Sequence, residues 1–385
     1  MNKKRNIYLM YAMALLQGMV FYGPVATLYR QAAGVGILQM AVIESLSTAL
    51  CIGLELPWGI LADKIGYRKT MIFCCTLYFI SKIVFWKADG FGAFLTERLM
   101  MSVVISGLSG VDESILYLSD QENAQSVFGI YNSLSMAGLL IASAVYSVWI
   151  GEDYRLAGFL TVISYGAAAV LSLGIREVKE KTEGRCLKKQ AESFGVELKG
   201  VLKNSSLLLF LAAFALFQES HQTITVFLSQ LQYVRCGLSG QAMGMIYMVM
   251  TILGLAGGFS ARLTKKAGEK RMIDCLFLTV SLACLTLACS SQAAVSVAAL
   301  CLIRICHSLA QPLRGVIQNR QVQEGGRATS LSIHAVIMDS IAIMTNLIFG
   351  KLADICLPAA MAAGAGFCFL GWLILHRRKI REGLL

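Results

Sequence analysis

Residues 55–69 read Glu-Leu-Pro-Trp-Gly-Ile-Leu-Ala-Asp-Lys-Ile-Gly-Tyr-Arg-Lys, and this stretch joins two apolar runs, 38–61 and 70–87. Each run falls in the range of roughly 17–25 residues that carries a helix across the hydrocarbon layer of a membrane. The stretch is therefore predicted to end one membrane helix and to turn at once into the next. Gly59 and Gly66 suit such a turn, because glycine takes positive φ without steric cost.

The charged residues of this stretch suit a loop at a membrane surface. Asp63 is expected to reach Arg68 across the turn, while Lys64 and Lys69 can contact anionic lipid headgroups. An ordinary short basic loop would carry one or two of these features. It rarely combines Gly, Leu-Ala-Asp, Gly and Arg-Lys at this spacing, so the stretch indicates a specific function.

The composition is that of a membrane protein. Of the 385 residues, 56% are hydrophobic and 15% are charged, and the mean hydropathy is +0.65. A soluble domain carries about 25% charged residues. The formal net charge of +11 raises the question of a nucleic-acid partner, but the positions of the basic residues give it another meaning.

Twelve apolar spans are predicted, so successive connections lie on alternate sides of the membrane. Of the 34 lysine and arginine residues, 26 fall on one side, 5 on the other and 3 within spans. Because lysine and arginine accumulate on the cytoplasmic side, both termini are predicted to be cytoplasmic, and no nucleic-acid partner is expected. The spans are 6–28, 38–61, 70–87, 91–113, 124–149, 156–175, 206–229, 240–261, 272–290, 293–313, 328–349 and 357–375.

Neither a metal site nor an enzyme is indicated. The twelve cysteines lie mostly within spans and never form Cys-x-x-Cys, so they are expected to pack as small hydrophobic side chains. No phosphate-binding loop of the Gly-x-x-x-x-Gly-Lys-Ser/Thr kind occurs, which argues against ATP-driven pumping. No nucleophile, base and orienting group gather in the sequence, and no cofactor is expected.

Residues 59–69 resemble the signature loop between helices 2 and 3 of the major facilitator superfamily of secondary transporters. The preceding Glu-Leu-Pro at 55–57 and the segments 312–319 and 327–332 resemble a bacterial branch of it. The resemblance implies an all-α integral membrane protein with twelve helices in two pseudo-symmetric halves, in a bacterial inner membrane. It also implies a gating role for the signature-loop residues Gly59, Asp63, Gly66, Arg68 and Lys69.

The chain is predicted to divide at its longest polar segment. We expect an N-terminal half at 1–175, a cytoplasmic linker at 176–205 and a C-terminal half at 206–385. Apolar residues recur at helical spacing between 187 and 202, so the linker is either a helix on the membrane surface or a disordered segment. The second half carries a degenerate copy of the signature loop at 258–271, with Gly268 retained and Lys265 at the position of Asp63.

Ionisable residues within the spans are the candidate site, because each is costly in lipid and normally faces a cavity or a partner. On the architecture that the resemblance implies, helices 1, 4, 7 and 10 line a central cavity. Glu219 and Asp339 lie near mid-membrane and have the least reason to serve structure alone. The predicted substrate or proton path comprises Gln17, Glu97, Arg98, Glu219, His221, Arg304, His307 and Asp339.

Structural roles remain open for several of these residues. Arg98 and Arg304 can hold helices together through carboxylates or backbone carbonyls, and His307 can be a packed polar residue. Glu219 can brace its helix against a neighbour. Lys82, about five residues from the outer end of its span, is expected to extend its amine to the membrane surface.

The sequence favours a secondary transporter that moves a small molecule by alternating access, with protons as the coupling ion and export as the direction. Import of a small polar solute is the first alternative, and a non-transporting membrane sensor or scaffold is the second. The expected partners are a small-molecule substrate, protons and lipid, and the chain is expected to be a monomer.

The topology predicts the outcome of reporter fusions. A reporter fused after Lys203 and a second one fused after Arg381 should both give a cytoplasmic signal, because of the 26-to-5 charge distribution. A periplasmic signal from either fusion would contradict the twelve-span map.

Overall fold

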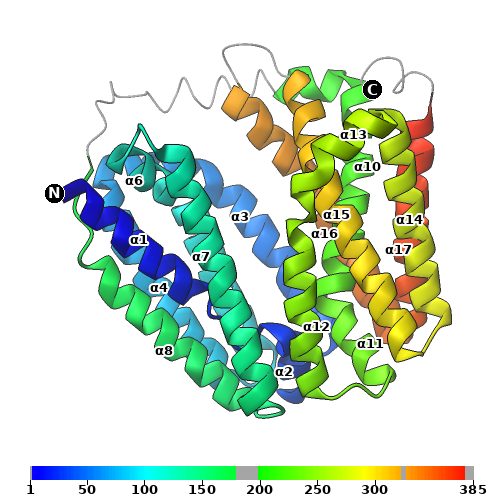
Figure 1. Ribbon diagram of the computed structural model, residues 1–385, viewed down its shortest axis with the longest axis horizontal. Coiled ribbons are helices and arrows are strands. Elements are labelled where there is room, and N and C mark those ends of the chain that lie inside the picture. Colours follow the sequence, from blue (N-terminus) through cyan, green and yellow to red (C-terminus); the bar gives the residue numbers. More distant parts are fainter. Residues whose placement is uncertain (1, 179–197, 322–326, 378–385) are drawn as a thin grey trace. The chain divides into compact units, whose positions relative to one another are not determined.

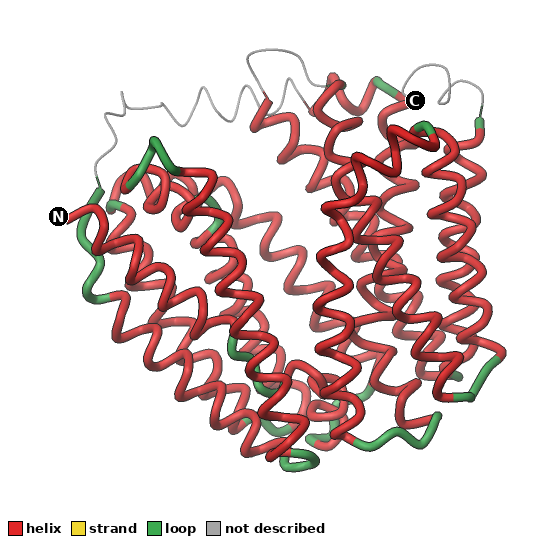
Figure 2. Tube along the Cα trace, viewed as in Figure 1, coloured by secondary structure: helices red, strands yellow, loops and turns green. Residues whose placement is uncertain are grey.

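The computed structural model describes residues 2–178, 198–321 and 327–377, and within these ranges it is helical, without strands (Figures 1 and 2). Twelve helices in this part of the chain are long and apolar enough to cross a membrane. Each overlaps one of the twelve spans predicted from the sequence, from the first at Lys4–Ala32 to the last at Leu357–His376. The predicted all-α integral membrane class is therefore confirmed.

The elements follow one another without a β-connection in the described ranges. They are α1 (Asn2–Gly18), η1 (Gly23–Val25), α2 (Ala26–Ala32), α3 (Ile37–Ile65), α4 (Tyr67–Lys87), α5 (Gly90–Leu108), α6 (Val111–Ser119), α7 (Ala124–Val145), η2 (Tyr146–Ile150), α8 (Tyr154–Ser172), α10 (Ser205–Gln222), η3 (Thr223–Leu228), α11 (Ser229–Arg235), α12 (Gly240–Leu253), η4 (Gly254–Phe259), α13 (Ser260–Ala267), α14 (Glu269–Cys289), α15 (Ala293–Arg320), α16 (Arg327–Ile355) and α17 (Leu357–His376).

Several predicted spans are segmented rather than continuous. The fourth changes direction between α5 and α6 at Gly110, whose φ of 79° is open to glycine at little cost. The seventh contains the π-helical turn η3 between α10 and α11, and the eighth contains the 3-10 turn η4 between α12 and α13. Such turns release backbone groups from the regular α-helical ladder, and they are frequent next to functional positions.

The described contacts separate the chain into two compact units. Unit 1 comprises Met1–Val35, Leu46–Glu183 and Ser239–Met248, and unit 2 comprises Gly36–Ser45, Gly184–Leu238 and Val249–Leu385. The start of α3 thus belongs to unit 2, where Ser45 Oγ donates to Ile343 O at 3.4 Å. The start of α12 belongs to unit 1, where Ser147 Oγ donates to Gln241 O at 2.8 Å.

Glycine permits the closest helix packing in unit 1. A Cβ on Gly18 of α1 would lie 2.2 Å from Ser135 O of α7, and one on Gly138 would lie 2.1 Å from Leu15 O. Small residues at such crossings let backbones approach closely, which drives helix association in a membrane. Alanine at either position would push α1 and α7 apart.

The two copies of the signature loop share a backbone conformation. Gly66 precedes α4 with φ 93° and ψ 146°, and Gly268 precedes α14 with φ 84° and ψ 148°. A carboxylate accompanies each loop: Glu177 accepts from the Arg68 backbone N–H at 3.3 Å, and Glu269 forms a two-point ion pair with Arg320. Glu177 is a partner of the first loop that the sequence did not single out.

Two sequence predictions lie outside what the structure describes. The side chain of Asp63 is not among the described ones, so the expected Asp63–Arg68 contact stays a prediction. The linker prediction falls mostly on 179–197, which the described ranges do not include.

Candidate functional site

The candidate site lies within unit 2, where α10 packs against α15 and α16. The first turns of α10 are apolar, and its last turns carry the polar run Gln-Glu-Ser-His-Gln at 218–222. Glu219 is 7% exposed and His221 is 1% exposed. An apolar helix that buries such side chains must supply them with polar partners from neighbouring helices.

His221 and His307 form the centre of the cluster. Their rings stack with centroids 3.6 Å apart and planes inclined by 2°, and they come from α10 and α15. Arg304 Nη1 lies 3.4 Å from His221 Nε2, and Gln311 Nε2 lies 3.3 Å from His307 Nε2. Because a guanidinium only donates hydrogen bonds, Nε2 of His221 is the acceptor in the first contact, and that nitrogen therefore carries no proton.

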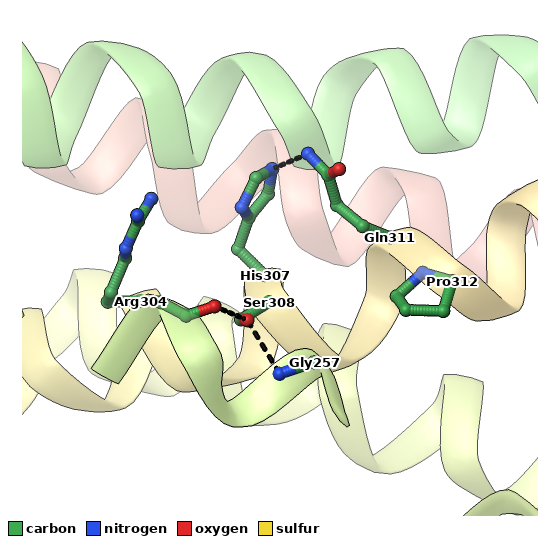
Figure 3. A pocket seen from close by; sticks show the side chains of 7 residues that line it. Gly257, Arg304, His307, Ser308, Gln311 and Pro312 are labelled. Atoms are coloured by element: carbon green, nitrogen blue, oxygen red, sulfur yellow. Dashed lines mark hydrogen bonds between the residues drawn. The ribbon is translucent and has the colours of Figure 1, made fainter. Parts of the chain in front are cut away.

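A cavity of about 300 Å³ opens beside these side chains. Figure 3 shows Arg304, His307 and Gln311 projecting from α15 to the same side. The volume lies at the small end of the range for small-molecule sites. The cavity is lined by Gly254, Gly257, Arg304, His307, Ser308, Gln311 and Pro312.

The glycines of η4 hold the wall of this cavity close to α15. A Cβ on Gly254 would lie 2.6 Å from Arg304 Nη2, and one on Gly257 would lie 2.8 Å from Ser308 O. Ser308 Oγ accepts from the Gly257 N–H at 2.8 Å and donates to Gly254 O (Figure 3). Arg304 Nε donates to Met250 O at 3.2 Å. The guanidinium is thereby oriented by backbone atoms.

Glu219 is directed toward α16. Its Oε1 accepts from Thr223 Oγ1 at 3.0 Å, and Thr223 Oγ1 also lies 3.3 Å from Asn346 Oδ1. Among the described residues, Glu219 forms no ion pair with a lysine or an arginine. Glu44 and Asp339, both within unit 2, are the other carboxylates whose charges act on it. Two other acidic side chains therefore act on Glu219 electrostatically.

The tenth span is longer than predicted. The sequence ended it at 313, close to Pro312, whereas α15 continues to Arg320. Arg314 is therefore part of the helix, and its side chain donates to Gln218 Oε1 of α10. Asp339 of α16 also acts on Arg314 electrostatically. Pro312 lies inside this helix, where it removes one backbone hydrogen bond, and the packing of α15 in unit 2 outweighs that loss.

A second polar cluster lies within unit 1. Lys82 of α4 donates to Glu97 Oε1 at 3.4 Å and to Tyr22 OH at 3.0 Å. Its ammonium also lies 5.1 Å from the ring centroid of Tyr78 and 5.4 Å from that of Tyr165. Lys82 is 4% exposed and Glu97 is 2% exposed. The cation is thus matched by a carboxylate and by aromatic faces, which attract it.

This cluster corrects the prediction for Lys82. Its amine was expected to extend to the membrane surface, but the side chain turns inward because Glu97 and the tyrosines stabilise the charge there. Glu97, one of the candidate path residues, accordingly contacts Lys82. Two other predicted path residues also lie in unit 1. Arg98 is half-buried on α5, and Gln17 Nε2 lies 3.5 Å from Cys75 Sγ.

The structure brings three predicted residues into one site, His221, Arg304 and His307, with Glu219 and Asp339 in the same unit. Sequence reasoning missed Gln311, Ser308 and Gly254. Gln311 and Ser308 follow His307 and Arg304 by four residues and share their helix face, so helical spacing carried that signal. Nothing in the sequence indicated that Gly254 would lie against Arg304.

Comparison with known proteins identifies related sequences and folds. The sequence model of the Major Facilitator Superfamily matches residues 7–345. No curated protein sequence matches the chain significantly. Among solved structures, the nucleoside transporter NupG is similar with a TM-score of 0.78 at 14% identity, over 98% of this chain and 100% of that one.

Two further structures share the fold. The D-xylose-proton symporter gives a TM-score of 0.69 at 14% identity, over 96% of this chain and 98% of that one. The POT family transporter PepTSo gives a TM-score of 0.71 at 13% identity, over 98% of this chain and 99% of that one. At these identities the likeness establishes the fold and not a shared substrate.

The buried Lys82–Glu97 pair predicts non-additive effects on stability. Glu97→Gln should lower the free energy of unfolding by about 3–5 kcal/mol, because it leaves a buried ammonium without its carboxylate. The double variant Lys82→Met, Glu97→Gln should be more stable than Glu97→Gln alone. Thermal unfolding of purified protein in detergent measures this, with the exposed Lys87→Met as the control. A double variant that loses the sum of both single effects would show that the two residues act independently.

Proposed function

Because the chain belongs to the major facilitator superfamily, whose sequence model matches residues 7–345, we propose that it is a proton-coupled exporter that moves a small molecule by alternating access. The halves 1–175 and 206–385 would rock about a central site, joined by the cytoplasmic linker 176–205. The protein would act as a monomer in a bacterial inner membrane, with both termini in the cytoplasm.

Proton coupling is supported by one observation above all, the environment of Glu219. Its carboxylate is buried in a membrane-spanning helix, and Thr223 is its hydrogen-bond donor among the described residues. A carboxylate in this position can hold a proton when it faces the membrane interior and can release it when water or a cation reaches it. Asp339, which acts on it electrostatically, is the second candidate for the same role.

The coupling step follows from these properties. When the site opens to the proton-rich side, Glu219 takes up a proton, and its neutral form allows the cavity to close. When the site opens to the cytoplasm, the proton leaves Glu219 and the substrate enters the cavity beside Arg304 and His307. Because proton release and substrate binding take place in the same open state, one proton enters for each substrate that leaves.

Proton-coupled import of a small polar solute is the second candidate. The cavity favours it, because Arg304, His307, Ser308 and Gln311 form a polar wall, and the similar structures include a D-xylose-proton symporter. Export remains the first proposal because the signature loop and its Glu-Leu-Pro prefix resemble those of bacterial exporters. A sensor or scaffold without transport would not need a buried carboxylate beside a polar cavity.

Vesicles containing the purified protein test the proposal directly. A panel of small acids, amines, sugars and antibiotics is screened for compounds that cause proton flux across vesicles with an imposed pH gradient. A compound that leaves the vesicle lumen as protons enter would support export. Movement of the compound in the same direction as the protons would support the importer. The scaffold would be favoured if the vesicles transport none of the compounds and if expression of the protein in a sensitised host gives resistance to none of them.

Glu219→Gln is expected to abolish proton-driven transport while sparing substrate exchange or binding, since glutamine retains size and hydrogen bonding but cannot titrate. Transport along an imposed pH gradient and exchange without a gradient are measured on the same vesicles. The exposed Glu152→Gln is the matched control. Accumulation or extrusion of substrate by Glu219→Gln along the gradient at the wild-type rate would exclude Glu219 as the coupling site.

The signature loop is proposed to act as a gate through Asp63 and Arg68, with Gly59, Gly66 and Lys69 shaping it. Asp63→Asn should reduce transport by about tenfold, because the loss of one gating contact changes the balance between the open states. Membrane expression should stay near normal. Lys64→Gln in the same loop is the control. If Asp63→Asn and Arg68→Ala both transport at wild-type rates, the loop is merely a turn.

A further inference from the structure

The charge distribution around the unit 2 cavity points to the chemistry of its ligand. Among the seven residues that line the cavity, Arg304 is charged and none is acidic. An arginine side chain stays protonated in proteins, so the cavity carries a permanent positive charge. The carboxylate of Glu219 is turned toward Thr223 and Asn346, on the α16 side of α10.

The guanidinium is held in place before any ligand arrives. Nε donates to the Met250 carbonyl, Nη1 contacts His221, and Nη2 lies against Gly254, where a side chain would displace it. The Gln311 amide, at His307, adds a second donor to the same wall. A guanidinium held in one orientation is the planar cationic group that recognises a carboxylate or another planar anion.

Arg304 is the charged residue among the seven that line the cavity, and the backbone carbonyl and the imidazole that it contacts are uncharged. His221 accepts from the arginine through Nε2, so the imidazole beside it is neutral. Ser308 is occupied by the backbone of η4 and is not a free donor. Further along the same helix, Arg314 adds a second cation, which contacts Gln218. The face of α15 that meets α10 therefore carries two arginines, Arg304 and Arg314.

We propose that this cavity binds a small organic acid, with the anionic group on Arg304 and Gln311 and the body of the molecule in the space beside His307 and Pro312. The inference rests on the proposed transport function, since it takes the cavity as the place where the transported molecule is recognised. A volume of about 300 Å³ limits the ligand to a metabolite-sized acid.

Thermal unfolding of the purified protein in nanodiscs tests this chemistry without a known substrate. Benzoate, lactate and succinate are compared at equal millimolar concentration with the neutral amides benzamide, lactamide and succinamide, and with the cation benzamidine. At least one acid should raise the unfolding temperature by about 2 °C or more, because a ligand that binds the native state stabilises it. Its amide and benzamidine should not.

Two pairs of variants connect the effect to Arg304. Arg304→Gln should weaken binding of the acid by at least about tenfold, whereas the exposed Arg235→Gln should not. Gly254→Ala retains the charge but displaces the guanidinium, and it should also weaken binding. Gly258→Ala in the same turn has open space around it and serves as its control. Gly254→Ala thereby keeps the test valid if Arg304→Gln does not fold.

The outcomes separate this inference from the proposed function. It is overturned if no acid stabilises the protein, if the amides or benzamidine stabilise it equally, or if the effect of the acid survives both Arg304→Gln and Gly254→Ala. In the last case Arg304 only braces α15 against α12. Proton-driven transport of a neutral or cationic compound would support the proposed transport function but exclude an organic acid as the transported ligand. If an acid stabilises the protein but is not transported in the vesicle assay, the acid-binding site is supported and the proposed export function is excluded.

Discussion

Lipid tails offer no hydrogen bonds, and this constraint governs the arrangement of the whole chain. Each backbone N–H and C=O within the bilayer must find its partner inside the protein, which leaves helices as the available element for this sequence. Side chains meet the same demand. Many Ser and Thr side chains in the spans return their hydrogen bonds to their own helix, as Thr76, Ser133 and Ser143 do to the carbonyls four residues earlier. Polar groups that cannot do so become the points at which helices are joined.

Charged groups meet this demand differently in the two units. In unit 1, Lys82 is enclosed by Glu97 and by tyrosine rings, so its charge is matched within a packed core. In unit 2, Arg304 is oriented by the Met250 carbonyl and by His221, and it lines a cavity. The first charge serves the packing of its unit, whereas the second lies at the wall of a cavity that a ligand can enter. This difference is the reason why the functional proposals concentrate on unit 2.

Glycine makes the placement of Arg304 at the cavity wall possible. In η4, the absence of side chains at Gly254 and Gly257 lets the backbone of one helix lie against Arg304 and Ser308 of another. The same residue type brings α1 against α7 and shapes both copies of the signature loop, where Gly66 and Gly268 share a conformation. The shared conformation supports the pseudo-repeat read from the sequence. The copies differ in their acidic partners, since Glu177 meets the backbone of the first loop and Glu269 pairs with Arg320 beside the second.

The sequence by itself determined the class of this protein, the number and order of its spans, and the family, because hydrophobic length and loop chemistry are local properties that need no partner. It also identified the rare ionisable residues within spans, since their cost in lipid is independent of the packing around them. Only the tertiary structure decided which of these residues meet. Lys82 turned inward because Glu97, Tyr22 and Tyr165 from other segments and Tyr78 of its own helix surround it. Likewise α15 continued past Pro312 because its neighbours support it, and His221 stacked on His307 although 86 residues separate them. Such contacts depend on helix rotation and on the gaps that glycines leave, and neither is encoded in the periodicity of a single span.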